Sequence, residues 1–174
     1  HAPTGLGKTL AVWLGPVVEA SAEHSHSSEP PCTILWITPL RALAQDTQQS
    51  LQEPLDALGL QWTVAMRTGD TPSNERQKLI RRPPDLLITT PESLYLMLTS
   101  TARETLVGVE TVIIDEIHAM STTKRGAHLA LTLERLEEVT DRPPQRIGLS
   151  ATQRPLEETA RFLGGYAGPV APRP

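Results

Sequence analysis

The sequence predicts an α/β fold built on a mostly parallel sheet. Short apolar runs alternate with longer stretches of helical period, the pattern of strands joined by crossover helices. The runs at residues 34–37 and 112–114 are apolar throughout, as expected for strands that helices cover on both faces. Proline pairs at residues 30–31, 83–84 and 143–144 stand before expected strands, where proline can end a helix.

The expected elements follow one another in a regular order. A helix is predicted over residues 8–20, directly after a glycine-rich segment, and the polar residues 21–31 are predicted to form a surface loop. The apolar runs predict strands at residues 33–38, 62–67, 85–89, 111–115 and 146–150. The stretches of helical period predict further helices at residues 42–58, 73–80, 92–99, 125–140 and 156–163.

The same patterns predict which side chains are buried. In the helix at 125–140, three leucines spaced i, i+4, i+7 are predicted to face the core, and three glutamates to form a solvated face. These residues are Leu129, Leu133 and Leu136, and Glu134, Glu137 and Glu138. Trp36 lies within an apolar strand and is predicted to be part of the core, and burial is also expected for Trp62 and Tyr95.

Composition and charge exclude several classes of protein. The chain has 174 residues, 39% hydrophobic and 21% charged, which fits one domain with a core. Its longest uncharged apolar stretch, residues 10–18, is too short to span a bilayer, so a membrane protein is excluded. The single cysteine, Cys32, excludes an internal disulfide framework. Because the net charge is −4, any nucleic-acid contact has to be local.

The segment APTGLGKT at residues 2–9 matches a phosphate-binding loop, with alanine in place of the first glycine. Gly5 and Gly7 let backbone N–H groups surround phosphate oxygens, and the following helix directs its positive dipole end at the same anion. Lys8 is expected to reach the β- and γ-phosphates, and Thr9 to place its hydroxyl on Mg²⁺. The expected nucleotide contacts are Thr4, Gly5, Leu6, Gly7, Lys8 and Thr9.

In the segment VIIDEIH, two carboxylates stand at the C-terminal end of a predicted buried strand. Ligands of open α/β sheets bind at the carboxyl ends of strands. Asp115 is therefore expected to hold Mg²⁺ and Glu116 to deprotonate the attacking water, with Lys8 as the third catalytic residue. Together with the phosphate loop, these acids predict hydrolysis of a nucleoside triphosphate. In the segment LSAT, the hydroxyls of Ser150 and Thr152 are placed to bond His118 or Asp115.

These segments occur in an order that resembles superfamily 2 DExH-box helicases: APTGLGKT, ITPLRALAQD, RTGDT, TTPESL, DEIH and LSAT. The chain is most similar to the large helicase-related (Lhr) family, notably in VIIDEIHAMSTTKRGAHLALTLERL and QRIGLSATQRPLEETARFLGG. The resemblance implies the first RecA-like domain, a three-layer P-loop NTPase fold lacking its first strand, over residues 1–170. Residues 171–174 would be a tail or the start of an interdomain linker.

The resemblance also implies two further groups of residues. His118, Ser150 and Thr152 would couple the nucleotide site to the nucleic-acid surface. Contacts to the backbone of one nucleic-acid strand are expected from Pro39, Arg41, Thr68, Gly69, Thr90 and Pro91. These contacts follow predicted strands and open helices, so free N–H groups and hydroxyls face phosphates, with little sequence preference. Arg41 has the alternative role of a plain surface arginine.

The implied function is that of an ATP- and Mg²⁺-dependent helicase that moves 3′ to 5′ along single-stranded DNA in the cytoplasm of a bacterium or archaeon. RNA or RNA–DNA hybrids are further expected substrates, and genome repair is the expected role. The chain begins inside its first motif, so we expect a fragment whose partner is a second RecA-like domain with arginine fingers. Alone, it is expected to hydrolyse ATP very slowly, and loss of a central strand is expected to leave a gap in its sheet.

Two other functions stay open. One is a DExH-box RNA helicase in RNA processing or decay. The other is a catalytically idle scaffold that only binds nucleic acid, against which the intact Lys8, Asp115 and Glu116 argue.

Overall fold

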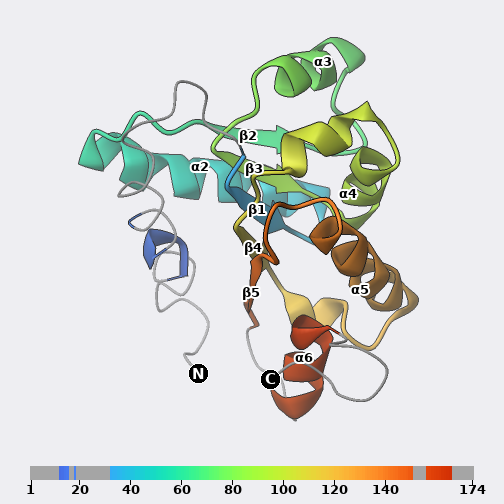
Figure 1. The fold of residues 1–174 in the computed structure, drawn as a ribbon. Helices are drawn as coiled ribbons and strands as arrows, with labels where there is room; N and C mark the ends of the chain where they lie inside the picture. Colours follow the sequence, from blue (N-terminus) through green and yellow to red (C-terminus); the bar gives the residue numbers. More distant parts are fainter. Residues whose placement is uncertain (1–11, 16–17, 19–31, 151–155, 166–174) are drawn as a thin grey trace.

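The computed structural model describes residues 12–15, 18, 32–150 and 156–165. These residues form a five-stranded sheet in which all neighbours are parallel, in the order β2-β3-β1-β4-β5 (Figure 1). The strands are β1 (Ile34–Ile37), β2 (Val64–Arg67), β3 (Leu86–Thr89), β4 (Thr111–Ile114) and β5 (Gln145–Gly148). The predicted parallel α/β sheet is therefore confirmed, although each strand is shorter than predicted.

Helices follow most strands, as the helical periods predict. They are α2 (Arg41–Leu58), α3 (Ser73–Arg81), α4 (Pro91–Leu98), α5 (Lys124–Glu137) and α6 (Leu156–Gly164). Two short 3₁₀ helices, η2 (Thr101–Leu106) and η3 (Ile117–Ala119), were not predicted. Residues 12–15 are helical, in agreement with the prediction for that stretch. Within the described ranges, no helix combines the length and apolar character needed to cross a membrane.

Alternation along the strands fills two apolar layers, one on each face of the sheet. In β1, Ile34 and Trp36 face the cluster that includes residues of α2, whereas Leu35 and Ile37 face the cluster with α4 and α5. The predicted three-layer arrangement is thus present, with α2 on one side of the sheet and α4 and α5 on the other (Figure 1). Trp36 is fully buried, as predicted.

Trp62 and Tyr95, for which burial is predicted, are only partly buried. Trp62 is half-buried, and its ring meets that of Trp13 edge-on, with 6.4 Å between the centroids. Tyr95 is half-buried against His128, with 4.9 Å between the ring centroids. The guanidinium of Arg135 lies 5.5 Å from the centroid of the Tyr95 ring.

The described strands pair consecutively, so the gap expected in the middle of the sheet is absent from this part of the chain. The edges of the described sheet are β2 and β5. β5 has an exposed first residue and three half-buried ones, whereas β1, β3 and β4 are buried throughout. The expectation was wrong because β1 pairs directly with both β3 and β4.

The solvated acidic face predicted for α5 is also wrong for two of its three glutamates. The side chain of Arg146 in β5 is only 7% exposed, and it forms ion pairs of 2.9 Å with both Glu134 and Glu137. It also donates a hydrogen bond of 3.4 Å to the carbonyl of Leu163 in α6. Glu138 is exposed, as predicted. The helical period could not reveal this contact, because the partner comes from a strand.

Candidate active site

The segment after β4 lies at the carboxyl edge of the sheet and is held from both sides. The Asp115 N–H donates to the carbonyl of Ile37, the last residue of β1, at 2.8 Å. The Ile117 N–H donates to the carbonyl of Leu149, just beyond β5, at 2.9 Å. These backbone hydrogen bonds place the two acids of the DEIH segment where ligands of open α/β sheets bind.

Glu116 has a backbone conformation that non-glycine residues seldom adopt. Its φ is 47° and its ψ is 41°, in the left-handed region. This conformation costs about 1–2 kcal/mol for a residue with a Cβ. The Glu116 N–H donates to Oδ1 of Asp115 at 2.9 Å, so the turn fixes one carboxylate against the backbone of the next residue. Strain of this kind is concentrated at functional sites.

Burial raises the pKa of the Asp115 carboxyl above its usual value. The charge of Glu116 raises this pKa further, while the Glu116 N–H and His118 lower it. The nearby indole N–H of Trp36 also lowers this pKa, although it forms no hydrogen bond of good geometry among the described residues. Burial is the largest of these effects, so the pKa of Asp115 remains above its usual value.

His118 stands between an acid and a hydroxyl. Its Nδ1 lies 3.1 Å from Oε2 of Glu116 and 3.4 Å from Oγ of Ser150. The predicted contact between Ser150 and His118 is therefore present. It joins the turn after β4 to the residue that follows Leu149 at the sheet edge.

The phosphate-loop residues Thr4, Gly5, Leu6, Gly7, Lys8 and Thr9 lie outside the described residues, as does Thr152. Their placement relative to Asp115 stays a prediction. The nearest described residues after the loop are 12–15, and both Val12 and Trp13 pack with the apolar cluster on the α2 face of the sheet.

The six residues predicted to contact nucleic acid lie after three neighbouring strands. Pro39 and Arg41 follow β1, Thr68 and Gly69 follow β2, and Thr90 and Pro91 follow β3. Because β2, β3 and β1 are adjacent and parallel, their carboxyl ends bring these pairs to one edge. We call these six residues the strand-contact edge. The Thr90 hydroxyl accepts a hydrogen bond from the Ser93 N–H and so caps α4, whose first residue is Pro91.

Arg41 lies against the loop after β2. Its Nη1 donates to both carboxylate oxygens of Asp70 at 2.6 Å, and a Cβ on Gly69 would come within 2.6 Å of its Nη2. Glycine at position 69 therefore leaves room for the guanidinium. Both members of the ion pair are exposed, with 58% of the Arg41 side chain and 72% of the Asp70 side chain accessible. The structure thus places two predicted contact residues, Arg41 and Gly69, next to each other. Both roles considered for Arg41, a contact to nucleic acid and a plain surface arginine, stay predictions.

Sequence reasoning missed Arg125, which ties the strand-contact edge to α5. Its Nε donates to Oε1 of Glu92 at 2.6 Å, and its Nη2 donates to the carbonyl of Pro39 at 3.0 Å. Partial burial raises the pKa of Glu92, but the hydrogen bond and charge of Arg125 lower it more, and the pKa is below its usual value. Helical periodicity could not single out this exposed arginine.

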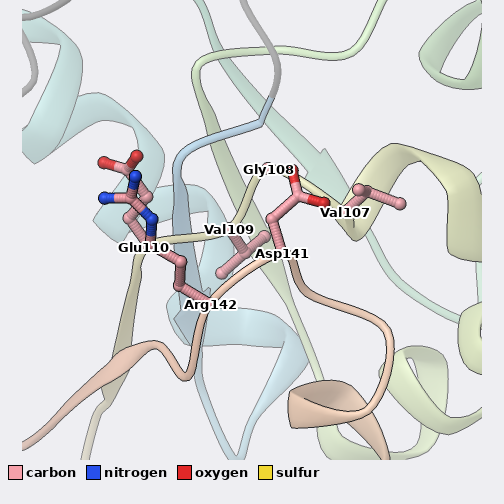
Figure 2. Close-up of a pocket in the computed structure, with 6 residues that line it drawn as sticks. All are labelled: Val107, Gly108, Val109, Glu110, Asp141 and Arg142. Atoms are coloured by element: carbon pink, nitrogen blue, oxygen red, sulfur yellow. The ribbon is translucent and has the colours of Figure 1, made fainter.

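A hollow of about 260 Å³ lies at the amino-terminal ends of β4 and β5, opposite the carboxyl ends that carry the candidate site (Figure 2). It is lined by Val107, Gly108, Val109, Glu110, Asp141 and Arg142. None of the predicted site residues that the structure describes lines this hollow, so it is separate from the turn after β4 and from the strand-contact edge.

Comparison with protein families matches residues 1–159 to the DEAD/DEAH box helicase family. The Lhr helicase/probable uracil glycosylase of Mycolicibacterium smegmatis is 54% identical over 95% of this chain and 12% of its own length. The Lhr helicase/uracil glycosylase of Escherichia coli is 53% identical over 94% and 12%. The ATP-dependent helicase Lhr-Core of Methanothermobacter thermautotrophicus is 44% identical over 95% and 20%. The chain thus spans a fifth or less of the length of these relatives.

Solved structures agree with the fold. A structure of Mycobacterium smegmatis helicase Lhr bound to ssDNA and AMP-PNP is 52% identical, with a TM-score of 0.84 over 96% of this chain and 22% of that chain. The DEAD-box helicase Mss116 bound to ssRNA and UDP-BeF has a TM-score of 0.81 over 94% of this chain and 34% of that chain. At 21% identity, the second likeness supports the fold alone.

Proposed function

Because the chain belongs to the DEAD/DEAH box helicase family, we propose that it is the ATP-binding part of an Lhr-type helicase. The whole protein would couple ATP hydrolysis to movement along single-stranded DNA and to duplex unwinding. Relatives named Lhr, 54% and 53% identical over nearly all of this chain, support the assignment. Since the chain covers 12% of their length, the activity of the whole protein is part of the proposal.

The observation that carries the catalytic part is the turn at Asp115 and Glu116. A strained residue at the carboxyl end of a central strand points to a constraint that folding alone does not require. Glu116 would orient the attacking water and accept its proton. Lys8, from the phosphate loop, would contact the β- and γ-phosphates, and the backbone of residues 4–9 would surround them.

Asp115 and Thr9 would hold Mg²⁺. The fit rests on the half-buried Asp115 carboxylate, whose pKa burial raises and whose negative charge a divalent cation would stabilise. The described residues contain no cluster of three or more His, Cys, Asp or Glu side chains that could hold a metal. A site with one carboxylate, that of Asp115, and one hydroxyl, that of Thr9, would suit Mg²⁺, which commonly uses one or two carboxylates together with substrate phosphates. When bound, the ion would neutralise charge on the transferred phosphoryl group.

Coupling between the two sites would run through His118, Ser150 and Thr152. The contacts of His118 with Glu116 and Ser150 support this, because they join the catalytic acid to the segment after β5. The strand-contact edge would bind the phosphate backbone of one strand. Support comes from the relative's structure with ssDNA, which is 52% identical to this chain.

The remaining assignments follow from the same family. Residues 1–170 would form the first RecA-like domain and residues 171–174 a tail or the start of a linker. A second RecA-like domain of the same polypeptide would complete the ATP site, so the isolated chain would turn over very slowly. Bacterial and archaeal relatives support an origin in the cytoplasm of such a cell.

The test measures ATP turnover by the intact protein that contains this chain, alone, with single-stranded DNA and with RNA of equal length. DNA is expected to stimulate turnover more than RNA. Glu116→Gln should lower turnover by a factor on the order of 10²–10⁴ while ATP still binds, because only the base is lost. Glu104→Gln, an exposed acid on η2, is the matched control.

Each contrary outcome has a distinct meaning. Stronger stimulation by RNA would favour an RNA helicase. Full turnover by the Glu116→Gln variant would remove the assigned base. Absence of turnover under every condition would favour a scaffold that only binds nucleic acid.

A further inference from the structure

Arg67, the last residue of β2, is a buried arginine without an anionic partner. Its residue is 7% exposed, and its Nη1 is sealed from solvent without a hydrogen-bond partner. No ion pair of Arg67 occurs in the described part of the chain. Arginine is almost never buried in this way unless it is paired, because the cost of removing its charge from water is then uncompensated.

The direction of the side chain follows from strand alternation. Val64 and Met66 pack with the cluster on the α2 face of the sheet. Arg67 therefore points to the opposite face, which α4 and α5 cover. It is paired in register with Thr89, whose hydroxyl donates to the Arg67 carbonyl at 2.8 Å. The next residue after Thr89 is Thr90, one of the six residues of the strand-contact edge.

The charges around Arg67 add to the imbalance. Burial lowers the pKa of its guanidinium, and the nearby charge of Arg76 lowers this pKa further. Asp70, three residues along the chain, is engaged by Arg41 at 2.6 Å. Arg76 itself donates to the carbonyls of Gly69 and Thr71, both at 2.7 Å. Arg41 and Arg76 thus both contact the loop after β2, and Asp70, the carboxylate of that loop, is already paired with Arg41.

We propose that Arg67 binds a backbone phosphate of the nucleic-acid strand, from beneath the loop that carries Thr68 and Gly69. This inference rests on the proposed function, since it adds a contact to the same strand-contact edge. Because Nη1 is buried, the phosphate is contacted through the other guanidinium nitrogen atoms. A phosphate oxygen supplies the negative charge that the described residues do not provide.

A role in binding predicts an unusual pair of effects. Arg67→Met keeps most of the side-chain volume but removes the charge. The variant should lose strand affinity, whereas its unfolding temperature without nucleic acid should stay equal or rise, because an uncompensated buried charge has been removed. An arginine with a merely structural role would give the opposite result for stability.

The experiment uses the intact protein and measures its affinity for a single-stranded oligodeoxynucleotide over a range of salt concentrations, without nucleotide. We expect Arg67→Met to weaken binding about tenfold and to lower the slope of log K against log salt by about 0.7, the value for one phosphate contact on a single strand. Arg142→Met, an exposed arginine at the opposite edge (Figure 2), should leave both unchanged.

Three results would overturn the inference. The first is wild-type affinity and slope in Arg67→Met. The second is unfolding of both Arg67→Met and Arg67→Gln without nucleic acid, which would make the arginine structural. The third is weaker binding of AMP-PNP with unchanged DNA binding, which would assign the anion to the nucleotide. If the wild-type protein binds no strand, the proposed function fails together with this inference. If the wild type binds the strand and Arg67→Met binds it equally well, only this inference fails, so the two failures are distinguishable.

Discussion

Nε of Arg125 donates a hydrogen bond of 2.6 Å to Oε1 of Glu92, across 33 residues of sequence. Arg125 stands in the first turn of α5, shortly after the DEIH segment, and Glu92 in the first turn of α4. The second hydrogen bond of Arg125, to the carbonyl of Pro39, reaches the loop after β1. One side chain thus connects Pro39 of the strand-contact edge and the first turn of α4 to the helix that follows the DEIH segment.

Arg125→Ala is expected to weaken binding of single-stranded DNA by the intact protein about fivefold, because one hydrogen bond that positions the edge is worth about 1 kcal/mol. Stability should fall by less than about 1 kcal/mol, since the Arg125 and Glu92 side chains are 45% and 56% exposed. Arg125→Lys should not restore the affinity, because lysine has no fork of donors for two acceptors. Titration by fluorescence anisotropy, with Arg135→Ala on the same helix as control, checks the prediction. Normal DNA affinity in Arg125→Ala would show that this arginine does not position the edge.

Asp115→Asn is expected to stabilise the protein at neutral pH when neither nucleotide nor metal is present. The pKa of Asp115 is higher in the folded than in the unfolded chain, so ionising it in place costs folding free energy. This cost is complete above the raised pKa and absent below about 3.9, the ordinary value for aspartate. The variant should therefore melt a few degrees above the wild type at pH 7.5, and the difference should vanish near pH 3.

Thermal melts at both pH values measure this effect, with Asp141→Asn, an exposed aspartate at the opposite edge, as control. A variant that melts below the wild type at pH 7.5 would mean that the Asp115 carboxylate supports the fold.

Arg146→Ala is expected to lower the free energy of unfolding by about 3–5 kcal/mol, the usual result of breaking a buried ion pair from one side. The side chain of Glu137 is only 15% exposed and would lose its ion pair with Arg146. Arg161→Ala, an exposed arginine on α6, should change stability by less than about 0.5 kcal/mol. Urea unfolding of both variants makes the comparison. Equal stability of the two would argue that Arg146 contributes no more than a surface pair.

Gly126→Ala is expected to destabilise the protein by about 1–3 kcal/mol through overpacking. A Cβ at this position would lie 2.0 Å from the carbonyl oxygen of Met120, a backbone atom that cannot move aside alone. The displaced first turn of α5 carries Arg125, so DNA affinity should fall as well. Gly15→Ala, where a Cβ would meet nothing within 4 Å, is the control and should not be destabilised. Urea unfolding and DNA titration of both variants test the two parts separately.

Much of the fold could be predicted from short-range pattern. Apolar runs located β1 and β4, and the resemblance in segments such as DEIH and TTPESL pointed to a helicase of Lhr type, which the family match and the Lhr relatives confirm. The same reasoning placed Asp115 and the pairs after β1, β2 and β3 at one edge, because parallel strands share a carboxyl edge. The catalytic and binding roles of these residues stay predictions.

The sequence by itself determined which segments form strands and helices and to which family the chain belongs. Local periodicity of apolar residues predicts the elements, and the order of the short motifs identifies the family. Only the tertiary structure decided that Arg146 would pair with Glu137, that Arg125 would join Glu92 to Pro39, and that Arg67 would have no anionic partner among the described residues. These relationships depend on how distant segments pack. The partner of a side chain depends on the space and the charges around it in the folded molecule. Neighbouring residues in the sequence therefore do not predict it.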